Sequence, residues 1–104
     1  TTTTRSAAMP DVPTMAEAGK SLGLARFDVN TWFGLFGPAH MPADVTARLN
    51  KAFVEALNSA DIKARMATLM AQPSPTTAEQ FGAFVKAELA KYGPVVKSSG
   101  ARAD

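Results

Sequence analysis

The feature that most constrains this fold is a run of aromatic and β-branched residues from Phe27 to Phe36. Alternate side chains of an extended chain point to opposite faces. One face would carry Phe27, Val29, Thr31, Phe33 and Leu35. The other face begins with Asp28 and Asn30 but continues with Trp32, so the run becomes apolar on both sides. This pattern predicts one strong strand over residues 27–37 that enters from solvent and finishes buried.

A single strand has backbone N–H and C=O groups that need partners. The only other candidates for extended pairing, residues 1–5 and 71–74, are weak. We therefore expect the sheet to be completed by residues outside this chain or by a second copy of it. The predicted fold class is α+β and rich in helix.

Apolar periodicity and capping residues predict helices near residues 13–18, 42–58, 60–71 and 77–97. Thr14 stands three residues ahead of Glu17, which is the spacing of a capping box, and Gly19 follows as a stop signal. The second helix has an apolar stripe of Val45, Leu49, Ala52, Phe53, Ala56 and Leu57. Ser59 is placed to cap the third helix.

The last predicted helix begins after a segment that contains Pro73 and Pro75. Thr76, three residues ahead of Glu79, predicts its capping box. Its apolar face would consist of Phe81, Phe84, Val85, Leu89, Tyr92 and Val96. Pro94 in the helix interior costs ~3 kcal/mol or more and predicts a kink or break nearby.

Composition excludes several classes of function. The chain has 104 residues, 46% of them hydrophobic, and a net charge of +2 from basic residues spread over several segments. Nucleic-acid binding requires clustered basic residues, so we expect no nucleic-acid partner. The chain has no cysteine, which excludes disulfides and thiolate chemistry. No stretch approaches the ~20 apolar residues of a membrane-spanning helix.

The residues that bear reactive groups do not combine into a catalytic or metal-binding motif. His40 is the only histidine and has no ligand-like spacing to other metal-binding residues, so we predict no metal site. Glu79 and Glu88 are not spaced to flank one reacting bond. The glycines near residue 37 lack the pattern of a phosphate-binding loop. We predict no catalytic residues, no cofactor and no enzymatic activity.

The sequence resembles the periplasmic substrate-binding receptors of tripartite tricarboxylate transporters, often called the Bug family. Three blocks in family order carry the resemblance: "PDVPTMAEAG" at Pro10–Gly19, "TWFGLFGP" at Thr31–Pro38 and "ARLN" at Ala47–Asn50. The chain departs from the family at Pro94 and in a longer link over residues 20–25. Because it opens without Met or a leader and family members are several times longer, we expect it to be a C-terminal fragment.

The resemblance implies a fragment of a two-lobed periplasmic-binding fold of the Venus-flytrap type. Residues 1–26 would belong to the second lobe and its crossover, and residues 27–104 would form the C-terminal part of the first lobe. The function implied is exported, periplasmic binding of a small organic anion, such as a carboxylate, with delivery to the membrane permease subunits of the transporter. The family's ligand loops lie mainly upstream of the matched region.

The resemblance also places residues 27–36 beside the ligand cleft, which makes Thr31, Trp32 and Phe33 the candidate ligand-binding residues. An aromatic wall excludes water from a carboxylate pocket, and a hydroxyl can hydrogen-bond to the anion. The alternative is that Trp32 and Phe33 are simply core residues. A second hypothesis is a self-associating helical module, in which a homodimer would form through the exposed strand edge or the last helix.

Overall fold

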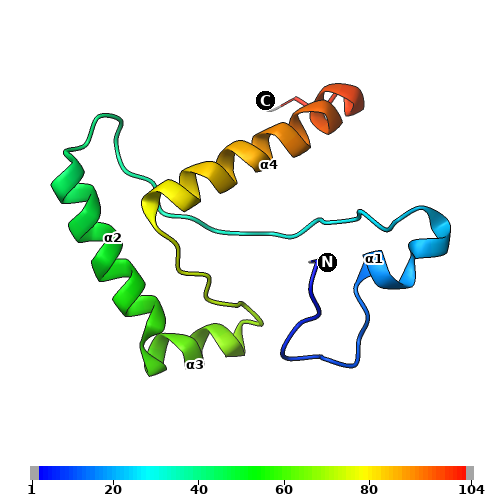
Figure 1. Cartoon of the computed structure of the whole chain (residues 1–104), viewed down its shortest axis with the longest axis horizontal. Coiled ribbons are helices and arrows are strands. Elements are labelled where there is room, and N and C mark those ends of the chain that lie inside the picture. The colour runs from blue at the N-terminus through cyan, green and yellow to red at the C-terminus, as the bar shows by residue number, and fades with distance from the viewer. Residues whose placement is uncertain (1–2, 103–104) are drawn as a thin grey trace. The chain divides into compact units, whose positions relative to one another are not determined.

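The computed structural model describes residues 3–102, which form helices joined by turns and extended segments (Figure 1). The helices are α1 (Met15–Ala18), the short 3-10 helix η1 (Lys20–Leu22), α2 (Ala43–Asn58), α3 (Ala60–Thr68) and α4 (Ala78–Ser99). The chain divides into an N-terminal unit that ends at Phe36 and a C-terminal unit that begins at Gly37. The predicted lobe boundary at residues 26 and 27 concerns a larger receptor and stays a prediction.

The N-terminal unit is organised by the predicted capping box around α1. The hydroxyl of Thr14 accepts a hydrogen bond from the Glu17 amide at 3.1 Å, and the Glu17 carboxylate accepts one from the Thr14 amide at 2.7 Å. Gly19 ends α1, as predicted, and its amide donates to the carbonyl of Met15. Gly23 then adopts the left-handed conformation (φ 80°) that ends η1, which a side chain would disfavour.

The strand predicted over residues 27–37 is wrong, and with it the α+β class and the periplasmic-binding sheet expected around that strand. Throughout the part of the chain that the structure describes, the helices are accompanied by no strand. The amide of Phe27 closes a turn on the carbonyl of Leu24 at 2.9 Å, after which the chain runs extended without ladder pairing. The physical reason is that a strand needs a second strand to satisfy its backbone N–H and C=O groups.

The C-terminal unit begins with α2 and turns sharply into α3. Ser59 ends one helix and caps the next, because its hydroxyl accepts from the Ile62 amide at 3.4 Å. The third helix ends at Thr68, earlier than predicted, where Met70 takes a left-handed conformation (φ 54°) and the Ala71 amide bonds back to the carbonyl of Met66 at 2.9 Å. These bonds satisfy carbonyls that would otherwise be left open at the helix end.

The N-cap of α4 lies one residue later than predicted. The N-cap is Thr77, which forms a capping box with Gln80, and not Thr76 with Glu79. Of the kink or break predicted near Tyr92, the break is wrong, since the helix runs through Pro94 to Ser99 and ends at left-handed Gly100. The kink stays a prediction.

Helix α2 turns a mixed face toward its own unit. Thr46, Asn50, Val54 and Leu57 are half-buried. The neighbouring part of the predicted apolar stripe stays largely open: Val45 is 36% exposed, Leu49 44% and Phe53 44%. No hydrophobic side chain among the described residues is fully buried, so neither unit has a closed core.

Candidate functional site

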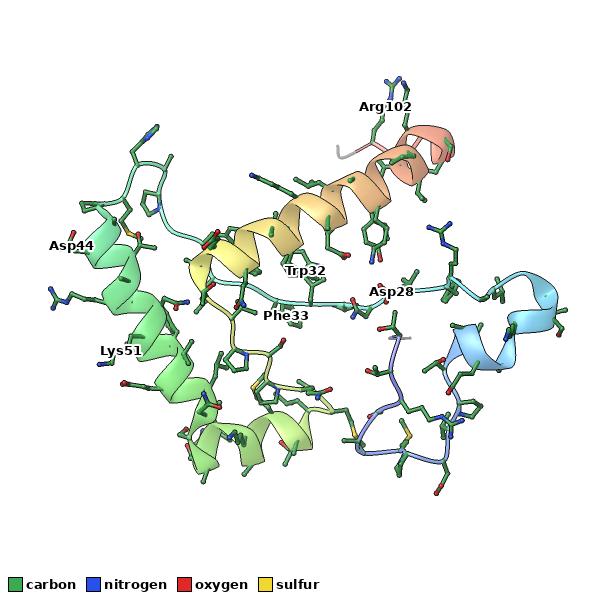
Figure 2. All side chains as sticks on the ribbon, in the orientation of Figure 1. Asp28, Trp32, Phe33, Asp44, Lys51 and Arg102 are labelled. Atoms are coloured by element: carbon green, nitrogen blue, oxygen red, sulfur yellow. The ribbon has the colours of Figure 1, made fainter. Side chains whose placement is uncertain are left out.

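The residues predicted to line a ligand cleft lie in the extended segment that follows the N-terminal helices. Thr31 is exposed, Trp32 is half-buried, and Phe33 is 93% exposed. Figure 2 shows the rings of Trp32 and Phe33 on opposite sides of the segment, as the alternation of an extended chain requires. A ligand that contacts one ring from this segment would therefore contact the other only by wrapping around the chain.

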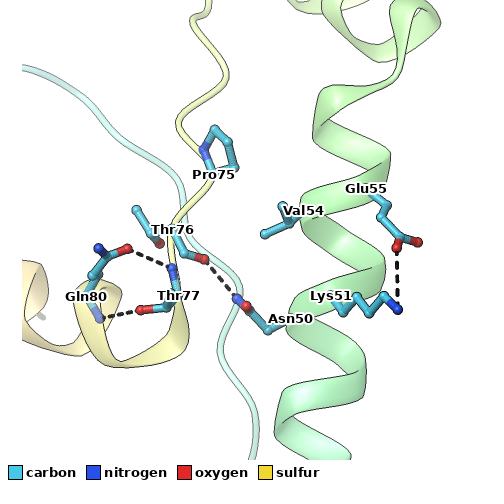
Figure 3. A pocket seen from close by; sticks show the side chains of 8 residues that line it. All are labelled: Asn50, Lys51, Val54, Glu55, Pro75, Thr76, Thr77 and Gln80. Atoms are coloured by element: carbon cyan, nitrogen blue, oxygen red, sulfur yellow. Dashed lines mark hydrogen bonds and ion pairs between the residues drawn. The ribbon is translucent and has the colours of Figure 1, made fainter.

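The C-terminal unit has a shallow groove between α2 and the approach to α4 (Figure 3). Its lining residues are Asn50, Lys51, Val54, Glu55, Pro75, Thr76, Thr77 and Gln80. Asn50 and Val54 project from α2 because they lie one helical turn apart on its inward face. The Asn50 side-chain amide donates to the Thr76 carbonyl at 2.9 Å and so ties α2 to the start of α4.

The remaining polar groups of this groove are engaged with one another. The Thr77 amide donates to the Gln80 side chain at 3.0 Å, and the Gln80 amide donates to the Thr77 hydroxyl at 3.1 Å. Lys51 lies 4.0 Å from the Glu55 carboxylate one turn along the same helix. These contacts cap the helices and connect them to each other, so their role in the groove is structural. A second shallow groove lies beside it, between the first turns of α2 and α4.

An ion pair holds the N-terminal segment against α1. The Arg5 guanidinium binds the Glu17 carboxylate at 2.9 Å and the Pro10 carbonyl at 3.2 Å, which folds the N-terminal segment back onto α1. The hydrogen bond from the Thr14 amide, followed by the one from Arg5, lowers the pKa of Glu17 below its ordinary value of 4.5.

The middle of α4 holds the least exposed carboxylate among residues 3–102. Glu88 is 8% exposed, and its Oε1 lies 2.6 Å from Nζ of Lys91, one turn further along the helix. That ammonium also lies 5.0 Å from the centre of the Tyr92 ring. Lys91 thus places an opposite charge beside this little-exposed carboxylate.

The reactive side chains among residues 3–102 include no group of three or more histidine, cysteine or acidic residues placed to hold a metal ion. No helix in the same range is long and apolar enough to cross a membrane. At the predicted cleft residues, Thr31 offers an exposed hydroxyl for hydrogen bonding and Phe33 an exposed ring for apolar contact.

Sequence reasoning missed two contacts between residues far apart in the sequence. The Arg5–Glu17 pair is a surface ion pair between residues twelve apart, and nothing in the local sequence singles out Arg5 among the five arginines of the chain. The Asn50–Thr76 bond had one available signal, because an asparagine inside an amphipathic helix often needs a partner for its amide.

Comparison with known proteins finds one family. A model described as the tripartite tricarboxylate transporter family receptor matches residues 1–101. Protein BugT of Bordetella pertussis is 33% identical over 98 residues, which cover 94% of this chain and 29% of that protein. A UPF0065 protein from the clcB-clcD intergenic region of Pseudomonas knackmussii is 30% identical over 88 residues, covering 85% of this chain and 50% of the relative.

A third relative extends the same pattern. A UPF0065 protein from the TAR-I ttuE-ttuC' intergenic region of Agrobacterium vitis is 33% identical over 104 residues, covering 96% of this chain and 29% of the relative. The chain thus spans half or less of the length of these curated relatives. No solved structure matches significantly.

Proposed function

Because the chain belongs to the tripartite tricarboxylate transporter receptor family, we propose that it is a C-terminal part of a periplasmic receptor that binds a small organic anion, such as a carboxylate, and delivers it to the membrane subunits of such a transporter. The observation that supports this function is the family match over residues 1–101. The proposed role is binding and not catalysis.

Within that receptor, Thr31, Trp32 and Phe33 are the proposed ligand contacts. The hydroxyl of Thr31 is exposed and can donate a hydrogen bond to a carboxylate, and an aromatic ring beside it would exclude competing water. Small-molecule sites bury 70–90% of a ligand's surface, roughly, and an exposed extended segment offers no such enclosure. The isolated chain is therefore expected to bind carboxylates weakly or not at all.

A hybrid receptor tests the proposal. The segment of BugT that aligns with this chain would be replaced by the residues of this chain, and the hybrid titrated calorimetrically with a panel of dicarboxylates and tricarboxylates. We expect at least one saturable, stoichiometric ligand for the hybrid and none for the isolated chain. Thr31→Ala should weaken binding about tenfold, the loss of one hydrogen bond to a charged group. Thr68→Ala, in the other unit, is the matched control. Tight binding by the isolated chain would contradict the proposal.

A second candidate function is self-association without ligand binding. The observation that favours it is the exposure of large apolar side chains, with Phe33 at 93% in the extended segment and Leu89 at 69% on α4. A homodimer would form through the Phe27–Phe36 segment or through α4. Light scattering over a range of concentrations separates the two candidates, because a chain that stays monomeric at high concentration excludes this one.

A further inference from the structure

Arg5 joins separate points of the N-terminal unit. Its Nε donates to both carboxylate oxygens of Glu17, at 2.9 and 3.2 Å, and its Nη1 donates to the carbonyl of Pro10 at 3.2 Å. The same carboxylate accepts a hydrogen bond from the Thr14 amide at 2.7 Å and so forms half of the capping box of α1. One guanidinium therefore connects the chain before α1 to the capping box of this helix.

These contacts contribute more to geometry than to stability. The side chains of Arg5 and Glu17 are 45% and 48% exposed, and exposed ion pairs contribute little to the free energy of unfolding. The planar guanidinium nevertheless fixes the directions of its donors, so an arginine that reaches two acceptors constrains how they lie relative to each other. We therefore expect Arg5 to set the orientation of α1 against the residues that precede it.

A second series of contacts connects α1 to the segment that carries the candidate ligand contacts. The Gly19 amide donates to the Met15 carbonyl at 2.8 Å, and the Leu24 amide donates to the Gly19 carbonyl at 3.0 Å. The Phe27 amide then donates to the Leu24 carbonyl at 2.9 Å. Gly19 is buried, and a Cβ there would lie 2.7 Å from Cδ1 of Leu24 and 2.9 Å from the Met15 carbonyl oxygen. The end of α1 and the residues that lead into the segment are thus packed without room for a side chain.

The direction of the segment at Phe27 affects where Thr31 lies. An extended chain rises ~3.3 Å per residue, so the chain from Phe27 to Thr31 spans about 13 Å. Over that length, a change of direction by about 5° moves Thr31 by about 1 Å. This shift exceeds the range of about 0.5 Å over which hydrogen-bond lengths ordinarily vary. A hydroxyl that binds a carboxylate from this segment is therefore sensitive to the orientation of the preceding turn and helix.

We propose that Arg5 is a positioning residue for ligand binding. Through Glu17 and α1 it sets the direction of the segment that presents Thr31, without touching the ligand itself. This inference rests on the proposed function, because it takes Thr31 to be a ligand contact. The competing role for an arginine in an anion receptor is long-range attraction of the anion, which any cation at position 5 would provide.

Substitutions in the BugT hybrid test the proposal. Affinity is compared by calorimetry for the carboxylates of the panel that the hybrid binds, succinate and citrate among the probes. Arg5→Ala should weaken binding between about threefold and tenfold, and by no more than the Thr31 hydrogen bond contributes. Lys20→Ala removes an exposed positive charge from the same unit and is the matched control, which should bind as the unsubstituted hybrid does.

A lysine at position 5 separates geometry from charge. Arg5→Lys keeps the positive charge but loses the planar group that reaches both Glu17 and Pro10. It should therefore weaken binding by at least about threefold, as Arg5→Ala does. Full affinity in Arg5→Lys would assign the effect to charge alone and would overturn the positioning role.

A double-mutant cycle distinguishes positioning from a merely structural contribution. Thr31→Ala is expected to weaken binding about tenfold in the hybrid. In the Arg5→Ala background it should weaken binding by less than about threefold, because a displaced hydroxyl has less affinity to lose. Arg5 is structural only, and the proposal is wrong, where Thr31→Ala has the same effect in both backgrounds. The same holds where Arg5→Ala lowers the melting temperature and leaves the affinity unchanged.

Hydrogen exchange of the chain itself separates this inference from the function on which it rests, since it requires no ligand. Arg5→Ala should speed exchange at the amides of Leu24 and Phe27 by at least about threefold, through easier local opening, and Lys20→Ala should not. Unchanged exchange at both amides would overturn the positioning role even where the hybrid binds ligand. A hybrid that binds no carboxylate of the panel would instead overturn the proposed function, and the positioning role with it.

Discussion

At the scale of single residues, the capping box of Thr14 and Glu17 fixes where α1 begins in the N-terminal unit. Thr14 is one of two buried polar or charged residues among those described, and both of its box partnerships were readable from the spacing Thr14 to Glu17. Replacing Thr14 with Ala should cost about 1 kcal/mol of local stability. Amide hydrogen exchange at Glu17, whose N–H the Thr14 hydroxyl accepts, measures the change. Thr14→Ser keeps the acceptor and should behave like the wild type.

The ionisation of Glu17 gives the same box a pH dependence. Its pKa is lowered in the folded state, so its carboxylate contributes stability above its ordinary value of 4.5, and this contribution is lost as the pH falls through the folded value. We expect exchange at the amides of Thr14 and Glu17 to speed up, relative to the rest of the chain, in that acidic window. Glu17→Gln should remove this pH dependence. An unchanged profile in the variant would contradict the assignment to Glu17.

At the scale of elements, the sequence identified the α-helices but not all their ends, and it missed the short 3-10 helix η1. The run Thr76-Thr77-Ala78-Glu79-Gln80 contains two overlapping capping boxes, and local spacing alone cannot choose between them. The structure uses Thr77, while the backbone carbonyl of Thr76 accepts from Asn50 in α2. A contact between residues 26 apart accompanies the choice, which is why sequence reasoning was off by one.

This difference is testable by paired substitutions. Thr77→Ala should destabilise α4 by about 1 kcal/mol, because the Gln80 amide loses its acceptor. Thr76→Ala should change stability by less than about 0.5 kcal/mol, since only its backbone carbonyl takes part in the contact with Asn50. Hydrogen exchange of the first turn of α4 distinguishes them. A larger effect at Thr76 would restore the cap that the sequence predicted.

A second prediction at this scale concerns the effect of Pro94 on the stability of α4. Pro94 has no N–H to donate to the carbonyl of Ala90, and it was expected to kink or break the helix, yet the helix continues unbroken to Ser99. Pro94→Ala should therefore increase helix content and slow amide exchange in the last turns, with a gain of up to ~3 kcal/mol in local helix stability. Circular dichroism at the helix band measures it. Pro73→Ala, outside the helices, should leave the signal unchanged.

The strand over residues 27–37 was mispredicted for a reason of the same kind. Alternation of Phe27 to Phe36 reports which side chains tolerate burial, but not whether a pairing strand exists. The candidate contacts Thr31, Trp32 and Phe33 were located in an extended segment, and this much follows from the residues. The local pattern of this sequence does not predict which residues would surround a ligand at these positions.

At the scale of the whole molecule, we expect unfolding with low cooperativity, because neither unit buries a hydrophobic side chain among the residues described. Burial of apolar surface is the dominant favourable contribution to folding. The isolated chain should therefore unfold over a broad temperature range and bind a hydrophobic fluorescent dye before heating. A sharp transition with an enthalpy near ~0.7 kcal/mol per residue would contradict this expectation.

The connection between α3 and α4 carries a consequence for sequence change. After the turn at residues 69–70 it runs from Ala71 to Thr77 with prolines at 73 and 75, whose restricted backbones make it stiff, and its far end is anchored by Asn50 at Thr76. Such a connection works as a spacer of set length. Its residue types can vary widely, whereas one inserted or deleted residue would shift Thr76 off its anchor and rotate the start of α4 away from the helix it joins.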